Sequence, residues 1–249
     1  MRETIVAAVA AATLAGMPAI AQEDSFYLDV LRIEAKIGHS MAFRDGVKAY
    51  MKCYDDAGGT DSWSTWSNMD GDGDVYHFVS RMENWAALDV REEARRTCWP
   101  VVEEQIAPHM SKSNTTYAKH LPDWSGDGMA EGTTVARVYY FSVDDRRKFR
   151  AAIGAIAGVL KTNDSEPPGT WYAVEGGSTD DAEYFVVDGF PNFAAMDDDR
   201  AGPYGTLKEH AGEDAADLIW DQYLESLEDG DSFWSSLMVY EPDLSHNGS

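Results

Sequence analysis

The sequence predicts an α+β fold in which one β-α-β-β-α-β unit occurs twice in a single chain. The first observation is that YHFVSRMENWAALD, beginning at Tyr76, returns as YFVVDGFPNFAAMD, beginning at Tyr184. The second is that the same offset aligns positions upstream, such as Trp63 with Trp171. The third is that short β-rich runs surround helical patterns in both halves. Because self-similarity within one chain marks a repeated structural unit, we expect two repeats.

The repeats are preceded by a segment typical of an export signal. Arg2 is followed by an apolar run over residues 5–17 and by an Ala-Ile-Ala triplet. This is the pattern of a secretory signal peptide, so we expect residues 1–21 to be removed and the mature chain to begin at Gln22. The expected localisation is periplasmic or secreted.

The rest of the chain divides into two repeats joined by a short linker. We expect the first repeat over residues 22–125, the linker over 126–133, the second repeat over 134–245 and a tail over 246–249. The linker sequence is polar and rich in Gly, a composition that disfavours helices and strands.

Each repeat begins with a strand followed by an amphipathic helix. Residues 27–33 and 134–143 are rich in β-branched and aromatic side chains, which predicts strands. In the segment that follows, apolar residues recur at spacings of four, three and four, which places them on one face of a helix. These positions are Phe43, Val47, Tyr50 and Tyr54 in the first repeat, and Phe149, Ile153, Ile156 and Leu160 in the second.

A β-hairpin follows the first helix of each repeat. Its strands are expected at residues 63–67 and 75–80 in the first repeat, and at residues 170–174 and 183–188 in the second. The connecting sequences, NMDGDGD and EGGSTDD, are rich in the Gly and Asp residues that turns favour. The first turn also resembles the start of an EF-hand calcium loop, but Val79 stands where that loop requires a bidentate Glu. A solvated turn is the expectation, and calcium binding stays an open alternative.

A second helical region and a fourth strand end each repeat. Asn84 and Asn192 are of the residue type that caps helices. Each is followed by an aromatic residue, Trp85 or Phe193, at the expected start of the helical region. The last strands are expected at residues 115–119 and 235–240. In the second repeat an insertion, DDDRAGPYGTLKEH, begins at Asp197. Its Gly and Pro residues predict a loop that interrupts the helix.

The order β-α-β-β-α-β is the split βαβ, or ferredoxin-like, motif. One such unit covers one face of its sheet with helices, so two units can bury their remaining faces together. In this order, and in the passage from third strand to second helix (RMENWAAL and GFPNFAAM), the chain resembles the dimeric α+β barrel superfamily. That superfamily includes antibiotic-biosynthesis-monooxygenase-like and NIPSNAP-like proteins. The resemblance covers most of each repeat and implies one barrel formed within the chain. Such barrels host oxygenases, haem enzymes, isomerase-like enzymes and proteins without known activity, so it implies no reaction.

The composition argues against several classes of partner. The chain carries 44 Asp and Glu against 20 Lys and Arg, a net charge of −24. This charge repels phosphate backbones and anionic lipid headgroups, so we expect neither a nucleic-acid nor a membrane partner. The absence of P-loop, GxGxxG and GxSxG motifs argues against a nucleotide cofactor and a serine nucleophile. We expect no cofactor, and a monomer or homodimer.

Cys53 and Cys98 both fall on predicted helices of the first repeat. In an oxidising compartment two cysteines can form one disulfide, which would join these helices. Two buried free thiols are the alternative. The pair lacks the CxxC spacing of a metal or thioredoxin-type site.

The candidate site consists of polar and aromatic residues on the predicted strands. His77 and Glu183, on the two third strands, are candidates for proton transfer. Asp29 and Arg137 occupy matching positions on the first strands and are candidate ligand contacts. The alternative is that Asp29–Arg137 and His77–Glu183 are buried pairs that satisfy each other without a ligand. The aromatic candidates for ligand contact are Trp63, Trp171, Tyr76 and Tyr184.

Three functions are open for a barrel of this kind. A mostly apolar interior with a few polar groups is the usual construction of a small-molecule site, so binding of a small apolar or aromatic molecule is the first hypothesis. The second is a cofactor-independent oxygenase or isomerase-like enzyme with His77 as proton carrier. The third is a structural or interaction protein whose interior is filled by side chains. Haem is not expected, because the one histidine on a strand that should line the barrel, His77, resembles a hydrogen-bonded core residue.

Overall fold

The computed structural model describes residues 25–71, 73–163, 167–178, 182–197, 202–228 and 232–248. The predicted signal peptide lies outside these residues, as does Asp72 of the candidate calcium turn. Within them the structure confirms the α+β class and the order of elements predicted for each half.

The strands and helices follow the sequence prediction closely. The first half contains β1 (Tyr27–Ala35), α1 (Ser40–Asp56), β2 (Ser62–Asn68), β3 (Asp74–Met82), α2 (Glu93–Val101) and β4 (Met110–His120). The second half contains β5 (Val135–Phe141), α3 (Arg146–Thr162), β6 (Thr170–Gly176), β7 (Tyr184–Phe190), α4 (Pro203–Ala211), α5 (Glu213–Leu224) and β8 (Phe233–Tyr240). Each predicted strand is therefore present, with ends that move by a few residues.

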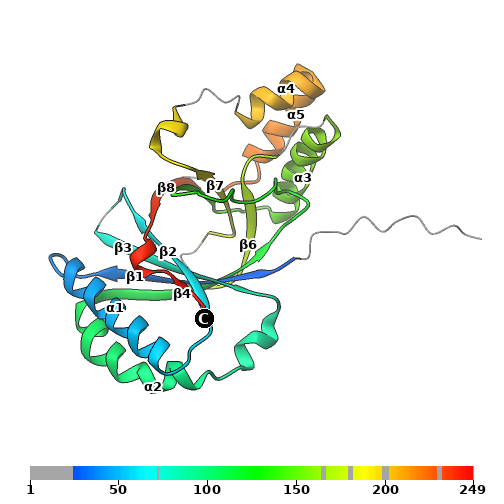
Figure 1. Ribbon diagram of the computed structural model, residues 1–249. Coiled ribbons are helices and arrows are strands. Elements are labelled where there is room, and N and C mark those ends of the chain that lie inside the picture. Colours follow the sequence, from blue (N-terminus) through cyan, green and yellow to red (C-terminus); the bar gives the residue numbers. More distant parts are fainter. Residues whose placement is uncertain are drawn as a thin grey trace, which may run out of the picture.

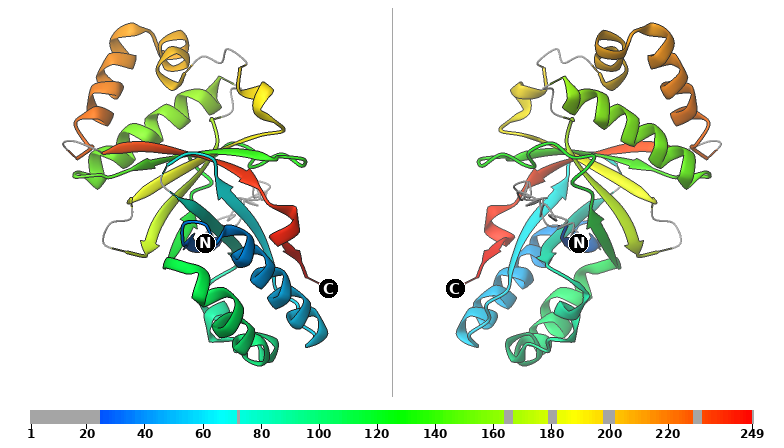
Figure 2. Two further views of the ribbon diagram at one scale, coloured as in Figure 1. Left: turned by 90° about the vertical axis from the view of Figure 1, so that its left-hand side faces the viewer. Right: turned by 90° about the vertical axis from the view of Figure 1, so that its right-hand side faces the viewer.

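Strands β1 to β8 form one closed antiparallel barrel. The hydrogen-bonded order is β3-β1-β4-β6-β7-β5-β8-β2, and β2 pairs again with β3, which closes the ring. The halves meet at two seams, where β4 pairs with β6 and β8 pairs with β2. Figures 1 and 2 show α1 and α2 on one side of the barrel and α3, α4 and α5 on the opposite side. Since every one of these strands has two partners, no barrel strand presents an unpaired edge.

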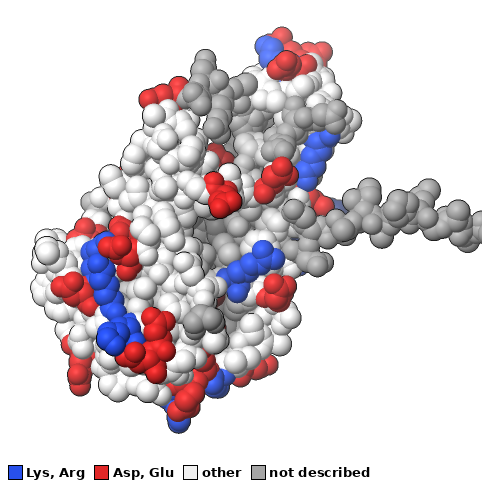
Figure 3. All heavy atoms as spheres, in the orientation of Figure 1, with Lys and Arg blue, Asp and Glu red and all other residues white. Residues whose placement is uncertain are grey.

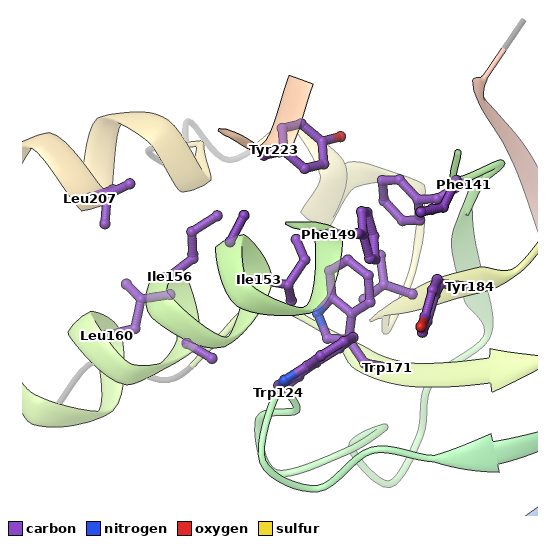
Figure 4. Close-up of a cluster of buried hydrophobic side chains, with 14 of the residues drawn as sticks. Trp124, Phe141, Phe149, Ile153, Ile156, Leu160, Trp171, Tyr184, Leu207 and Tyr223 are labelled. Atoms are coloured by element: carbon purple, nitrogen blue, oxygen red, sulfur yellow. The ribbon is translucent and has the colours of Figure 1, made fainter. Parts of the chain in front are cut away.

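The core of the second half lies between its helices and the outer face of the barrel. The predicted apolar face of α3 is buried here, which confirms its spacing: Phe149 and Leu160 are almost fully enclosed. Phe149 stacks on Tyr184 of β7 with ring centroids 4.8 Å apart. Figure 4 shows these side chains and Trp171 gathered beneath α3.

The core of the first half is built in the same way. Phe43 and Val47 of α1 pack against Ile33 of β1 and Tyr76 of β3. A disulfide joins Cys53 of α1 to Cys98 of α2, at a sequence separation of 45. The disulfide therefore fixes the two helices of this layer to each other.

The segment after β4 leaves the first half and completes the core of the second. Trp124 belongs to the buried cluster under α3, and its ring lies 5.9 Å from that of Trp171 (Figure 4). The Ser125 hydroxyl accepts a hydrogen bond from the backbone N–H of Trp171 at 2.9 Å. Residues predicted to end the first repeat thus contact the second half.

The segment after β8 makes the reciprocal crossing. Leu244, in a short 3₁₀ turn (Pro242–Leu244), is fully buried in the core of the first half. The Ser245 hydroxyl accepts a hydrogen bond from the backbone N–H of Thr65 at 2.8 Å. A two-residue strand, β9 (His246–Asn247), then pairs with β2. The hydrophobic core of each half is therefore completed by a segment that follows the last strand of the other half.

The segment after Asp197 differs from its prediction. We expected a loop, but residues Pro203–Ala211 form helix α4. Pro203 stands at the start of the helix, where its missing N–H removes no hydrogen bond. Gly212, at φ 85°, ends α4 and separates it from α5. Gly and Pro here mark the two ends of a helix.

The two Asn residues cap turns shorter than expected. The Asn84 side chain accepts a hydrogen bond from Ala86 N, and that of Asn192 accepts one from Ala195 N. Both therefore act as caps, but of 3₁₀ turns, Trp85–Asp89 and Phe193–Met196. The α-helices of these regions begin later, at α2 and α4.

The surface carries the acidic excess of the composition. Figure 3 shows Asp and Glu over both halves of one face, with fewer Lys and Arg among them. No helix in the described part of the chain is long and apolar enough to cross a bilayer.

Candidate functional site: a cavity inside the barrel

The barrel contains a cavity of about 620 Å³. This volume lies within the range of about 300–1,000 Å³ that is usual for small-molecule sites. Its wall comes from all eight barrel strands, because side chains alternate between the two faces of a strand. Even-numbered residues of β1, β2, β4, β5, β6 and β8 face inward, as do odd-numbered residues of β3 and β7.

The wall supplied by the second half is aromatic. Tyr172 of β6 stacks on Phe185 of β7 with ring centroids 4.9 Å apart, and Tyr140 of β5 stacks on Trp234 of β8 at 5.4 Å. All four side chains line the cavity. Ring faces and edges of this kind suit contact with another aromatic or apolar molecule.

The wall supplied by the first half carries polar groups. Arg32 of β1 lies directly opposite His77 of β3 and, on its other side, opposite Asn114 of β4. Side chains of directly opposed residues project from the same face of a sheet, with Cβ atoms about 4.5–5.5 Å apart. Arg32, His77 and Asn114 therefore form one polar group on the cavity wall.

His77 is buried and held in its neutral form. Burial, and then the charge of Arg32, lowers the pKa of His77 to about 4. Its Nε2 lies 3.1 Å from Oδ1 of Asn68 on β2. In the tautomer that donates from Nε2, the Nδ1 atom keeps its lone pair and can accept a proton. Because Nε2 is already engaged and a cation lies beside the ring, the site does not fit His77 as an axial haem ligand.

Glu183 does not join His77. It precedes β7, and its carboxylate accepts a hydrogen bond from Val143 N at 2.9 Å and lies 3.5 Å from the guanidinium of Arg146. These contacts attach the start of α3 to the barrel rim. Since β3 and β7 lie four strands apart in either direction round the ring, the predicted His77–Glu183 pair is wrong.

Asp29 and Arg137 are also apart. Both are odd-numbered residues of β1 and β5, so they project from the outer face, and the two strands stand on opposite sides of the barrel. Burial raises the pKa of Asp29, and the charge of Arg95 opposes this rise. Arg137 donates to the Tyr139 hydroxyl at 3.3 Å. The predicted Asp29–Arg137 pair is therefore wrong.

The four aromatic candidates lie on the outer face as well. Trp63 stacks on His246 and donates from Nε1 to the carbonyl oxygen of Leu244 at 2.9 Å. Tyr76 hydrogen-bonds Ser40 at 2.6 Å. The structure places these side chains, and those of Trp171 and Tyr184, against helices and terminal segments and away from the cavity.

The cavity residues that the sequence analysis missed follow from strand alternation. Once His77 is placed inside, Arg81, four residues further along β3, must be inside too. Arg32 must then face inward as well, because it pairs with His77 in the β1–β3 register. The alternation of residues along each strand contained this information. To use it, one must know which face of the sheet the helices cover.

Two side-chain oxygens of the candidate calcium turn already have partners within the barrel. Asn68 Oδ1 contacts His77, and Asp70 Oδ2 accepts a hydrogen bond from Leu237 N at 3.0 Å. Among the described residues, no group of three or more His, Cys, Asp or Glu could hold a metal ion. These contacts favour a turn that is fixed to β8.

Comparison with known proteins supports the fold. No protein-family model and no curated protein matches the chain. Among solved structures, it is similar to a monooxygenase-like protein from Lactobacillus acidophilus NCFM, with a TM-score of 0.52 and 12% identity over 91% of this chain and 98% of that chain. It is also similar to an anthrone oxidase-like protein, with a TM-score of 0.53 and 12% identity over 88% of this chain and 93% of that one.

A third similar structure is a mutant chlorite dismutase from Candidatus Nitrospira defluvii in complex with cyanide. Its TM-score is 0.50, with 8% identity over 89% of this chain and 92% of that chain. Identities this low show a shared fold and carry no residue of a site from one protein to another. The chain has the fold of the dimeric α+β barrel proteins.

Proposed function

We propose that this protein binds a small apolar or aromatic molecule inside its barrel. The observation that supports the proposal is the cavity of about 620 Å³, with an aromatic wall and a few polar groups. Eight-stranded barrels are commonly filled by their own side chains or hold one small ligand. An interior that is left open loses the dispersion contacts that a filled one gains, and an apolar ligand would restore them.

An enzyme built on the same cavity is the second candidate. His77 favours it, because a neutral imidazole with a lone pair on Nδ1 can accept a proton from a bound molecule. The guanidinium of Arg32 would stabilise the anion left behind. A cofactor-independent oxygenase or isomerase-like reaction would begin with this step. Loss of turnover in His77→Ala with ligand binding retained would favour the enzyme over a binding protein.

The binding proposal can be tested with a neutral bicyclic aromatic amide, 2-naphthamide, by isothermal titration calorimetry. The decisive variant fills the cavity from two sides. Val30 and Val138 face inward from β1 and β5, which stand on opposite sides of the barrel. In Val30→Trp/Val138→Trp, two indole rings would occupy the space between these walls. We expect the wild type to bind the probe and this variant to lose binding.

The matched control places the same two indoles outside. Leu31→Trp/Tyr139→Trp changes the neighbouring residues of the same strands, whose side chains face away from the cavity, and should keep wild-type binding. Circular dichroism would establish that both variants fold. Equal binding of the amide by the filled variant would refute a ligand site in the barrel. Failure of the wild type to bind either this amide or the acid of the same ring system would also refute it.

We also propose that the protein is exported and loses residues 1–21. The apolar N-terminal run and its small-residue triplet support this. The intact mass of protein recovered from the exported fraction would correspond to a chain beginning at Gln22.

A further inference from the structure

The charge of the cavity wall is opposite to that of the protein as a whole. The chain has 44 acidic and 20 basic side chains. Among the described residues that line the cavity there are three cations, Arg32, Arg81 and Lys112, and no Asp or Glu. A wall that gathers cations without carboxylates has a positive potential, which favours a negatively charged ligand.

Arg32 is the cation best placed to meet a ligand. Arg81 is already engaged, because its guanidinium lies 3.9 Å from the ring centroid of Phe26 and 3.9 Å from Glu83. Among the described residues, neither Arg32 nor Lys112 forms an ion pair with a carboxylate. Arg32 lies nearer the middle of its strand than Lys112 does, beside the neutral ring of His77. The positive charge of Arg32 therefore has no carboxylate partner among the described residues of the cavity wall.

The second half of the barrel is aromatic at the strand positions that correspond to this polar group. The β1–β3 and β1–β4 registers place His77 and Asn114 on either side of Arg32. In the second half, the corresponding registers place Phe185 and Trp234 on either side of Tyr140. The same three strand positions thus hold a cation and two polar groups in one half, and three aromatic rings in the other.

We infer from this polarity that the ligand is an aromatic carboxylate. Its carboxylate would pair with Arg32, and its ring system would lie against the aromatic side chains of the second half. A planar guanidinium can donate two parallel hydrogen bonds to one carboxylate, a geometry that an ammonium group does not offer. This inference rests on the proposed function and specifies the chemical class of its ligand.

The test compares two probes of nearly equal size, 2-naphthoate and the neutral 2-naphthamide, by calorimetry at pH 7.5. Charge-assisted hydrogen bonds are stronger than neutral ones, so we expect the wild type to bind the carboxylate at least tenfold more tightly than the amide. In Arg32→Met, this preference should fall to less than threefold, while amide binding stays close to that of the wild type. The amide thereby reports whether the variant still has its cavity.

The matched control is Arg96→Met, which removes one positive charge from an exposed ion pair with Glu93. It should keep the full preference, which separates a local contact from the net charge. If Arg32→Met does not fold, Arg32→Gln, which keeps hydrogen-bond donors but not the charge, serves as the second variant with the same expectation.

The outcomes separate this inference from the proposed function. If both probes bind with equal affinity, or if Arg32→Met keeps the preference, the inference is overturned and the binding function stands. If neither probe binds, the ligand site itself is refuted. A carboxylate preference that is lost with Arg32 and kept with Arg96 supports the inference.

Discussion

His77 links the cavity to the stability of the protein in acid. Its pKa is about 4 in the folded protein and about 6.5 in an unfolded chain. As the pH falls below 6.5, the unfolded chain binds the proton first, so protonation favours unfolding. The contribution is complete above pH 6.5 and is lost as the pH falls to 4, up to about 3 kcal/mol. Because this loss belongs to one buried ring, replacing that ring should remove it.

We therefore expect His77→Gln to lose less stability than the wild type between pH 7.5 and pH 4.5, measured by urea unfolding at both values. Carboxylates that titrate in the same window contribute to both proteins, so the difference between them isolates His77. Parallel losses in His77→Gln and the wild type would contradict the burial of a neutral imidazole.

Of the individual residues proposed from the sequence as catalytic or ligand-binding, only His77 lines the cavity. Strand alternation divides the residues of each strand into two sets, but both faces of this barrel are covered. In β1, Ile33 packs under α1 while Val30 faces the cavity, and both are apolar. Since hydropathy is alike on the two faces, it could not place Trp63 or Trp171 outside. Only the contacts with the helices show which alternate residues of each strand face outward and which face the cavity.

At the scale of elements, the two terminal segments exchanged between the halves carry much of the packing. Leu244 is fully buried against residues of α1 and β1, although it belongs to the chain of the second half. Its backbone oxygen also accepts hydrogen bonds from Trp63 Nε1 and the Thr65 hydroxyl. This turn therefore acts as a structural part of the first half.

We expect Leu244→Ala to lower the free energy of unfolding by about 2–5 kcal/mol, the usual cost of a large buried cavity. The measurement is chemical denaturation followed by tryptophan fluorescence. Leu218, on α5, is largely exposed and provides the matched control, so Leu218→Ala should change stability by less than about 0.5 kcal/mol. A small effect of Leu244→Ala would show that the crossing segment does not support the first half.

The element order was predictable because each strand and helix has a local signal. The face of α3, with Phe149, Ile153 and Leu160 at helical spacing, is buried as expected. The crossings of Trp124 and Leu244 have no such signal, because a single apolar residue after a strand does not indicate which core it enters. The helix α4 was missed for a related reason: Gly and Pro mark helix ends as well as loops.

At the scale of the whole molecule, the two halves form one barrel, and they line its cavity with different side chains. The seams β4–β6 and β8–β2 join them by backbone hydrogen bonds, and the exchanged segments join them by packing. The cavity exists only when both halves are present, since its polar wall comes from one and its aromatic wall from the other. A ligand that spans both walls would therefore stabilise the assembled barrel against unfolding.

Native mass spectrometry of the mature protein, purified from its own exported fraction, tests the ligand site most directly. We expect a discrete mass above that of the chain, released on denaturation and identified by its fragments as an aromatic molecule that carries a carboxylate. The Val30→Trp/Val138→Trp variant, prepared in parallel, should lack that mass. A wild-type mass that matches the bare chain, with no bound molecule recovered from the same preparation, would contradict a barrel that carries a ligand.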